Sequence, residues 1–384
     1  MGPVVLFYLP GSDTGGIATS FRSLAAFLES RGMTVKVLLP YAADVSAADI
    51  PSRYVVGFAR RRRIRNRLAT RLLNLFNALT RYRFFFVGVP RIRHDVFVVY
   101  QTWYNAHWRR YSRRPTVGWL HGMAEPPYGT LGDRLRSWSV GRDLERFGRT
   151  VAVSDEVADS YVTRYGLRRR PQVIRNLADI DRIVRKGGAV GKACPAGHRL
   201  AFVGRLSPEK GLLRLLQAFV RLRTEAPDLS IDVVGDGEER EACMRFAEMH
   251  GLAGAVRFEG LLEDPLPAMR RADLLVVPSL HEGCPCVIGE SLLVRTPVLA
   301  TDCGGTRTAL RGGDWGLLVP NTDEGLCEGL RKWLADGSVV LPREGFDAVE
   351  RELRSVRRRS CGELAALFDG ALGGCSAGGQ VDIL

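Results

Sequence analysis

Short apolar runs alternate with amphipathic stretches along most of the chain. In its first part the apolar runs, which predict buried strands, cover residues 4–9, 34–40, 95–100, 116–121, 150–154 and 172–177. In most of the segments between these runs, including residues 17–31, apolar residues recur at helical spacing, which predicts helices. Alternation of strand and helix in this way is typical of a largely parallel sheet.

A second series of the same kind follows residue 198. Its predicted strands cover residues 199–206, 229–237, 256–260, 274–279, 297–302 and 315–320, and its helices begin near 211 and 285. The segment 185–198, rich in Gly, Ala and Lys, is interpreted as a linker or a loop beside one. A last helical region is expected over 345–372.

We therefore predict an α/β fold of two Rossmann-like, doubly wound domains that face each other across a cleft. The expected limits are 1–182 and 183–344, with the helical segment 345–384 packing back toward the first domain. A length of 384 residues suits two domains. Ligands of open parallel sheets bind beyond the carboxyl ends of the strands.

The length of the apolar runs and the spacing of the cysteines indicate in which compartment the protein is expected. The apolar runs are much shorter than the ~20 residues that span a bilayer. The first residues lack a basic segment and a small-residue cleavage site, so we do not predict a signal peptide. The eight cysteines show no zinc-type spacing and fit a reducing compartment. A cytoplasmic location is expected.

The net charge of +13 is concentrated in one segment. No acidic residue lies between Ile50 and His94, and residues 59–86 combine many arginines with apolar residues at helical spacing. Such a helix either packs on the core with its basic face in solvent, or docks on anionic lipid. Nucleic acid is a weaker alternative, because no nucleic-acid-binding motif is present. We predict contact of residues 53–93 with an anionic membrane surface.

The stretch HEGCPCVIGESL, residues 281–292, places Glu282 and Glu290 on either side of Pro285. Proline suits the start of a helix, and the first amides of that helix, near Cys286 and Val287, favour an anion. Eight helical residues span ~12 Å, more than the ~5–9.5 Å between paired carboxylates that cleave one glycosidic bond. The glutamates are interpreted as hydrogen-bonding groups at the two ends of an extended ligand.

The stretch FVGRLSPEKG, residues 202–211, supplies two cations after a predicted strand. The guanidinium of Arg205 and the ammonium of Lys210 suit a diphosphate and could neutralise a departing one without a metal. A lone basic pair more often faces solvent. Its place after a strand, in the same domain as the two glutamates, favours the functional interpretation.

Four motifs in order, GRLSPEKG, VVGDGEERE, VRFEG and PSLHEGCPCVIGE, resemble the donor-binding domain of retaining GT-B glycosyltransferases of family 4. The two glutamates match that family's E-x7-E motif. The resemblance is clear from 150 to 322 and vaguer before it. There, TGG at 14–16 is similar to the family's glycine loop, and His121 matches its cleft histidine.

The resemblance implies a role for each matching residue. Glu282 would bind hydroxyls of the donor sugar and Glu290 the ribose, while Arg205 and Lys210 would grip the diphosphate. His121 would lie near the reacting face of the sugar, and a buried structural histidine is the alternative. The remaining implied donor-binding residues are Gly15, Gly16, Asn176, Gly260, Leu261, Leu262, Gly283, Cys284, Cys286 and Val287.

One stretch departs from the family pattern. The usual Pro-Asn-Gly turn before an acidic residue is Arg175-Asn176-Leu177 here, so Asp179 or Asp181 is left to fill the position of the acid. Residues 179–181 also match the D-x-D pattern of metal-dependent transferases of another fold, and we interpret them as a turn.

The implied reaction is retaining transfer of a hexose or N-acetylhexosamine from a nucleoside diphosphate sugar, with UDP favoured over GDP. The expected acceptor is a membrane-associated glycan or lipid-linked saccharide of the cell envelope, with peripheral attachment to the inner face of the plasma membrane. A soluble acceptor, or a synthase or phosphorylase of the same fold, is the alternative. A dehydrogenase is disfavoured because the first loop lacks G-x-G-x-x-G. No cofactor or essential metal is expected.

Overall fold

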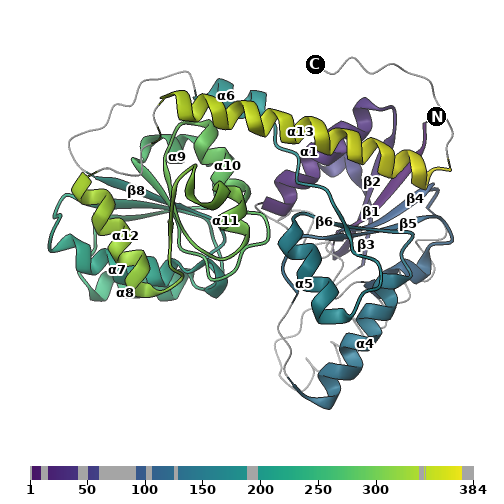
Figure 1. Cartoon of the computed structure of the whole chain (residues 1–384), viewed down its shortest axis with the longest axis horizontal. Helices are drawn as coiled ribbons and strands as arrows, with labels where there is room; N and C mark the ends of the chain where they lie inside the picture. The colour runs from purple at the N-terminus through teal and green to yellow at the C-terminus, as the bar shows by residue number, and fades with distance from the viewer. Residues whose placement is uncertain are drawn as a thin grey trace. The chain divides into compact units, whose positions relative to one another are not determined.

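The structure is a computed structural model that describes residues 2–9, 16–41, 51–59, 92–100, 106–124, 129–187, 198–336, 341 and 343–373. The chain divides into two compact units (Figure 1). The N-terminal unit comprises Met1–Leu177 with Arg358–Leu384, and the C-terminal unit comprises Ala178–Arg357. The limits expected from the sequence were 182 and 344.

The N-terminal unit contains a seven-stranded sheet in the order β3-β2-β1-β4-β5-β6-β7, in which all neighbours are parallel. The strands are β1 (Val4–Tyr8), β2 (Thr34–Tyr41), β3 (Val55–Ala59), β4 (Val96–Tyr100), β5 (Thr116–Leu120), β6 (Arg149–Ala152) and β7 (Gln172–Val173). Every residue of β1, β4 and β5 is buried. Strands covered on both faces read as continuous apolar runs, which is why the sequence located these three.

Five helical segments lie between the strands in the described part of this unit. They are α1 (Gly16–Ser30), η1 (Ser52–Tyr54), η3 (Ala106–Tyr111), α4 (Leu131–Glu145) and α5 (Asp155–Tyr165). Helix α1 packs on the sheet through Phe21, whose ring meets Phe7 of β1 edge-on with centroids 5.2 Å apart. Helix α5 begins after Ser154, whose Oγ accepts a hydrogen bond from Val157 N, and ends at Gly166 in the left-handed region.

The C-terminal unit contains a six-stranded parallel sheet in the order β10-β9-β8-β11-β12-β13. The strands are β8 (Arg199–Val203), β9 (Ser230–Val234), β10 (Val256–Gly260), β11 (Leu274–Val277), β12 (Val298–Thr301) and β13 (Leu317–Val319). The order runs outward in both directions from the β8–β11 pair. The chain therefore reverses its direction of winding between these two strands, where doubly wound sheets bind ligands.

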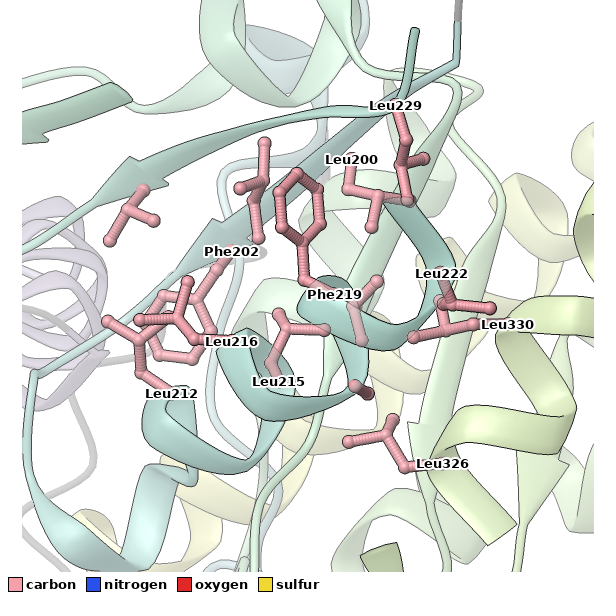
Figure 2. Packing of buried hydrophobic residues seen from close by; sticks show 14 of the residues in the cluster. Leu200, Phe202, Leu212, Leu215, Leu216, Phe219, Leu222, Leu229, Leu326 and Leu330 are labelled. Carbon is pink, nitrogen blue, oxygen red and sulfur yellow. The ribbon is translucent and has the colours of Figure 1, made fainter. Parts of the chain in front are cut away.

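Ten helical segments accompany this sheet in the described part of the unit. They are α6 (Ile180–Gly187), η4 (Pro208–Lys210), α7 (Leu212–Arg223), α8 (Arg240–Met249), α9 (Leu266–Arg271), α10 (Cys286–Leu293), α11 (Gly305–Ala309), η5 (Arg311–Gly313), α12 (Asp323–Asp336) and α13 (Arg343–Ala371). In Figure 2, Leu216 of α7 lies beside Phe202 of β8, and Phe219 of the same helix lies toward Leu200. Leu326 and Leu330 of α12 belong to the same buried cluster. Burial of each such side chain contributes about 1.5–3 kcal/mol.

Helix α13 belongs to both units. Its first half carries Phe346 and Val349, which are buried in the core of the C-terminal unit. Its second half lies in the N-terminal unit and carries the buried residues Leu364, Leu367 and Phe368. The division between the units at this end of the chain thus falls inside a continuous helix.

Two sequence-based interpretations were wrong. The segment 185–198 is not a linker at its start, because α6 continues to Gly187, where a Cβ would lie only 3.1 Å from Val294 Cα. Residues 188–197 lie outside the described residues. Residues 179–181 are not a turn: α6 begins at Ile180, and Asp179 just before it accepts a hydrogen bond from Arg182 N at Oδ1.

Other differences concern strands and the basic segment. Of the strand expected over 172–177, only Gln172–Val173 is extended in the sheet, and β3 was not predicted. The basic helix expected within 59–86 falls almost entirely on residues 60–91, which lie outside the described residues.

Candidate active site

Lys210 and Glu282 meet at the point where the C-terminal sheet reverses its winding. Lys210 ends η4, in the loop after β8, and Glu282 lies in the loop after β11. The two strands are neighbours, and Lys210 Nζ lies 2.7 Å from Glu282 Oε1. The structure therefore joins a cation and a carboxylate that are far apart in sequence.

The Glu282 carboxylate is held in place by a second donor. Ser279 Oγ donates a hydrogen bond of 2.8 Å to the same oxygen, Oε1. The side chain of Glu282 is 8% exposed and that of Lys210 is 29% exposed. A carboxylate buried to this degree needs both a counter-charge and hydrogen bonds. Ser279 was not singled out from the sequence, although it lies within the PSLHEG motif.

Backbone contacts fix the loop that carries Glu282. Thr301 Oγ1 donates to the carbonyl oxygen of Ser279 over 2.6 Å, and Glu282 pairs with Gly304 in an isolated parallel bridge. A Cβ on Gly305 would lie 2.6 Å from the carbonyl oxygen of Glu282. The residue at 305 must therefore be glycine for the loop after β12 to approach this closely.

The loop that carries Lys210 is tied to the loop after β11. Leu280 N donates to Glu209 O over 2.8 Å. Gly211 has φ +69°, and a Cβ there would lie 2.2 Å from Pro278 O. The two loops are thus in direct backbone contact, which sets the distance between the ammonium and the carboxylate.

Arg205 shares this loop with Lys210. Its side chain is exposed, and its positive charge acts on Glu209. Burial raises the pKa of Glu209, but a hydrogen bond from Ser207 Oγ, a bond to its own backbone amide and the charges of Lys210 and Arg205 outweigh it, so the pKa is lowered. The predicted diphosphate-binding cations therefore lie around one anionic loop residue.

Helix α10 begins where the sequence indicated. Pro285 precedes its first residue, Cys286, and no side chain caps this end. Glu290 is half-buried within the helix. Gly283 is buried, and Cys284 and Val287 are half-buried beside the helix start. The amides that the sequence assigns to a phosphate cradle are therefore at a helix N-terminus.

Cys303 lies near the Lys210–Glu282 ion pair, and no sequence pattern had indicated this residue. Burial raises the pKa of its thiol, and the negative charge of Glu282 acts in the same direction. Its Sγ lies 3.5 Å from Thr306 Oγ1. The thiol is thus kept protonated beside the Glu282 carboxylate.

The residues predicted to meet the base lie farther along the sheet. Gly260 ends β10, an edge strand that is separated from β8 by β9. Gly260 has φ +71°, Leu261 is 55% exposed and Leu262 is half-buried. Their assignment to the base remains a prediction.

In the N-terminal unit, polar groups gather at the corresponding reversal of winding, between β1 and β4. Ser20 Oγ of α1 lies 2.9 Å from the Tyr100 hydroxyl and donates to Asn176 Oδ1 over 2.7 Å. Gly16 is the first residue of α1, whereas Gly15 lies outside the described residues. Asn176 is thereby fastened to α1, and its assignment to donor binding remains a prediction.

His121 follows β5 and lies against Tyr100, with ring centroids 4.2 Å apart. The side chain as a whole is half-buried, but Nε2 is shielded from solvent and has no hydrogen-bond partner among the described residues. Burial lowers the pKa of His121 to about 3. The imidazole is therefore neutral near pH 7, and its catalytic role remains a prediction.

The described residues contain neither a cluster of potential metal ligands nor a membrane-spanning helix. Within the described ranges, no three His, Cys, Asp or Glu side chains are grouped so that they could hold a metal ion. No helix among those residues combines the length and apolarity required to cross a bilayer.

Two doubly wound parallel sheets, each with polar groups at its reversal point, define a GT-B type of α/β protein. The solved structure of HepE from Anabaena in complex with UDP and glucose has this fold. It superposes with a TM-score of 0.70 over 95% of this chain and 100% of that one, at 19% identity. At this identity the similarity shows the fold alone.

Family comparisons add the class of enzyme. Residues 14–182 match the model of Glycosyltransferase Family 4, and residues 197–336 match that of Glycosyl transferases group 1. Both parts of the chain thus match a glycosyltransferase domain, in a fold of the GT-B type.

Individual relatives align over part of their length. The lipopolysaccharide core biosynthesis glycosyltransferase LpsE of Rhizobium meliloti is 33% identical over 195 residues, which are 50% of this chain and 54% of LpsE. Glycogen synthase of Mycobacterium tuberculosis is 31% identical over 247 residues, 63% of this chain and 55% of the relative. The chain thus spans about half the length of these relatives.

Proposed function

We propose that the protein is a retaining hexosyltransferase that moves a hexose or N-acetylhexosamine from a nucleoside diphosphate sugar to an acceptor hydroxyl. The observation that supports this most directly is the Lys210–Glu282 pair at the reversal point of the C-terminal sheet. That position is where doubly wound sheets bind nucleotides. The pair offers a cation for phosphate and an oriented carboxylate for sugar hydroxyls.

In this proposal Lys210 and Arg205 bind the donor diphosphate and stabilise it as it leaves. Charge-assisted hydrogen bonds to a departing diphosphate act mainly in the transition state, where the charge develops. The amides at the start of α10 add positive potential at the same group. Glu282 binds hydroxyls of the sugar, and Glu290 binds the ribose.

The buried environment of Glu282 favours a binding role over a nucleophilic one. Its Oε1 already accepts hydrogen bonds from Lys210 and Ser279. A carboxylate that is neutralised in this way is a weak nucleophile, whereas it is well placed to orient a hydroxyl. We therefore propose attack on the same face as the leaving group, with a departing phosphate oxygen taking the proton of the acceptor.

Substrate identities are proposed from chemistry and from relatives. UDP is favoured because the HepE structure contains UDP and glucose. A membrane-associated glycan or lipid-linked acceptor of the cell envelope is favoured because LpsE is named for lipopolysaccharide core biosynthesis, and because residues 53–93 are strongly basic. Attachment would be peripheral, on the cytoplasmic face. No metal is required in this proposal.

A soluble glycan acceptor is the second candidate, favoured by the similarity to glycogen synthase. Transfer to a soluble oligosaccharide in the absence of lipid would support it. Transfer that requires a lipid-linked or micellar acceptor would support the first candidate.

The test measures protection against heat unfolding by UDP, GDP and a panel of their sugars, followed by transfer with the protective donor. A ligand at about 100 times its Kd should add about 2.7 kcal/mol to the free energy of unfolding. Lys210→Ala, Arg205→Ala and Glu282→Gln should reduce transfer by more than about 100-fold, because each removes a group that contacts the donor. The anomeric configuration of the product, read by NMR, tests retention.

Lys186→Ala is the matched control. Lys186 also pairs with a carboxylate, that of Asp264, but both side chains are partly exposed, and the pair is formed by α6 and the loop before α9. Its loss should leave transfer unchanged. Wild-type turnover in the Lys210, Arg205 and Glu282 variants would refute the assignment.

A further inference from the structure

Helix α4 buries its acidic side chains. Asp133 and Asp143 are 8% and 5% exposed at the side chain. Asp133 Oδ1 lies 2.6 Å from Arg164 Nη2 of α5, and Asp143 Oδ1 lies 2.7 Å from Arg110 Nη2 of η3. The inner face of α4 is therefore held by ion pairs more than by apolar packing.

The opposite face of α4 is apolar and exposed. Leu131, Leu135 and Trp138 are 74%, 61% and 62% exposed. Spacings of four and three residues place them in one stripe along the helix. A surface helix ordinarily turns such a stripe toward the core. Single exposed apolar residues are common, but a stripe of large ones marks an interaction surface.

The exposed charges of α4 are all positive. Arg134, Arg136 and Arg142 are exposed, whereas the two aspartates point inward. The guanidinium of Arg142 stacks on the Trp138 ring, 4.5 Å from its centroid. Glu145, the remaining acidic residue of α4, is half-buried and accepts a hydrogen bond from Arg168 N. The outer face thus combines large apolar side chains with cations.

We propose that the outer face of α4, defined by Leu131, Leu135, Trp138, Arg134 and Arg142, docks on an anionic lipid bilayer. Leucine and tryptophan side chains enter the boundary between headgroups and acyl chains, and arginines beside them contact the anionic headgroups. Helix α4 lies at one end of the N-terminal unit, beside α5 (Figure 1). The exposure of Leu131, Leu135 and Trp138 makes its outer face accessible to a flat surface.

Charge favours lipid over a second copy of the chain. Two copies that met through this face would bring arginines against arginines, which is unfavourable. An anionic bilayer offers both the apolar layer and the opposite charge. The inference extends the proposed membrane-associated acceptor, but the docking is measured without any turnover.

The experiment measures co-sedimentation of the full chain with vesicles of phosphatidylcholine, alone or mixed with phosphatidylglycerol. The wild type should bind the mixed vesicles, and added salt should weaken binding. The double variant Leu135→Ser/Trp138→Ser should bind at least about tenfold more weakly, because it removes most of the apolar stripe. Arg134→Gln/Arg142→Gln should lose the preference for phosphatidylglycerol.

Met249→Ser is the matched control, because Met249 is 75% exposed but lies on α8 in the C-terminal unit. It should bind vesicles like the wild type. All these side chains are exposed, so each variant should keep the wild-type unfolding temperature, and a lowered temperature identifies a folding defect. In that case Trp138→Gln alone is the substitute variant.

Several outcomes overturn the proposal. Wild-type vesicle binding by the folded double variant would assign the lipid contact to another part of the chain, such as residues 60–91. Equal binding to both kinds of vesicle would remove the role of charge. A dimer in solution that Leu135→Ser/Trp138→Ser dissociates, without vesicle binding by the wild type, would assign the face to a second copy. Failure of sugar transfer with normal vesicle binding would refute the proposed function and leave the docking face intact.

Discussion

Ser279 shows how one buried hydroxyl orients the carboxylate of Glu282. It is 1% exposed and donates to the oxygen of Glu282 that also meets Lys210. Without this donor the carboxylate can rotate about its last bond, and Lys210 alone determines its position. The hydroxyl is therefore a positioning group for the proposed sugar-binding site.

We predict that Ser279→Ala lowers kcat/KM about 10- to 100-fold, which corresponds to the loss of one hydrogen bond to a charged group. The affinity for free UDP should stay unchanged, because UDP lacks the sugar that Glu282 is proposed to contact. Ser291→Ala is the control, since Ser291 is also buried and donates to the backbone, at Thr296 O. Equal effects of the two substitutions on sugar transfer would contradict the positioning role.

The lowered pKa of His121 predicts how the free energy of unfolding changes as the pH falls. Burial lowers its pKa to about 3 in the folded chain, below about 6.5 in an unfolded one. Between these values the unfolded chain binds more protons, so the free energy of unfolding falls as the pH is lowered through this window. Burial lowers the pKa of His94 as well, which adds to the same slope.

We expect His121→Gln to lose stability less steeply than the wild type between pH 6.5 and 4. Urea unfolding at a series of pH values measures the slope, and His94 maintains part of it in the variant. Identical slopes would show that the folded imidazole titrates normally.

At the scale of elements, the loop after β8 depends on one close backbone contact. Gly211 combines φ +69° with a Cβ position 2.2 Å from Pro278 O. Gly251 has a similar φ of +64° but open space around its Cβ position. An alanine at position 211 would therefore suffer both backbone strain and a steric clash, whereas an alanine at position 251 would suffer strain alone.

Gly211→Ala should lower the free energy of unfolding by about 2–4 kcal/mol, the sum of strain and overpacking, and should move Lys210 away from Glu282. Gly251→Ala should cost about 1 kcal/mol and leave donor binding unchanged. Chemical unfolding and UDP titration measure the two effects. A Gly211→Ala variant that binds UDP like the wild type would show that the loop tolerates the shift.

Elements that are buried on both faces were predicted well from the sequence. The runs at β1, β4 and β11 are continuous and fully buried, as is typical of strands that are covered on both faces of a parallel sheet. The start of α6 was missed because residues 179–181 were interpreted as a turn, and its end at Gly187 because Gly, Ala and Lys suggested a linker or loop. Tertiary packing instead favours a helix here, because Gly187 lets the end of α6 approach Val294 closely.

The candidate site could be predicted only in part. The motifs identified Lys210 and Glu282 singly, but their contact depends on which strands are neighbours, and a single sequence does not show strand order. The loops after β11 and β12 bring Ser279 and Cys303 close to Glu282. No local pattern marks such contacts, which explains why both residues were overlooked.

At the scale of the whole molecule, helix α13 makes the stability of both units depend on one element. Phe346 is buried in the C-terminal unit and Phe368 in the N-terminal unit. The same substitution at the two positions therefore tests each unit separately.

Phe368→Ala should lower the stability of the N-terminal unit by about 3–5 kcal/mol, through lost burial and the cavity left behind. Phe346→Ala should lower that of the C-terminal unit by a similar amount. Calorimetry with and without UDP should show that UDP raises the transition weakened by Phe346→Ala more than the one weakened by Phe368→Ala. A single transition affected equally by both substitutions would mean that the units unfold together.

The contact between Lys210 and Glu282 also affects which anions the proposed site accepts. An ammonium that is already neutralised by its own carboxylate exerts little pull on stray phosphate or sulfate in the surroundings. A ligand that engages only the ammonium strands a desolvated carboxylate, which is unfavourable. A molecule that brings hydroxyls together with phosphates compensates both partners at once, so the pair should discriminate against simple salts.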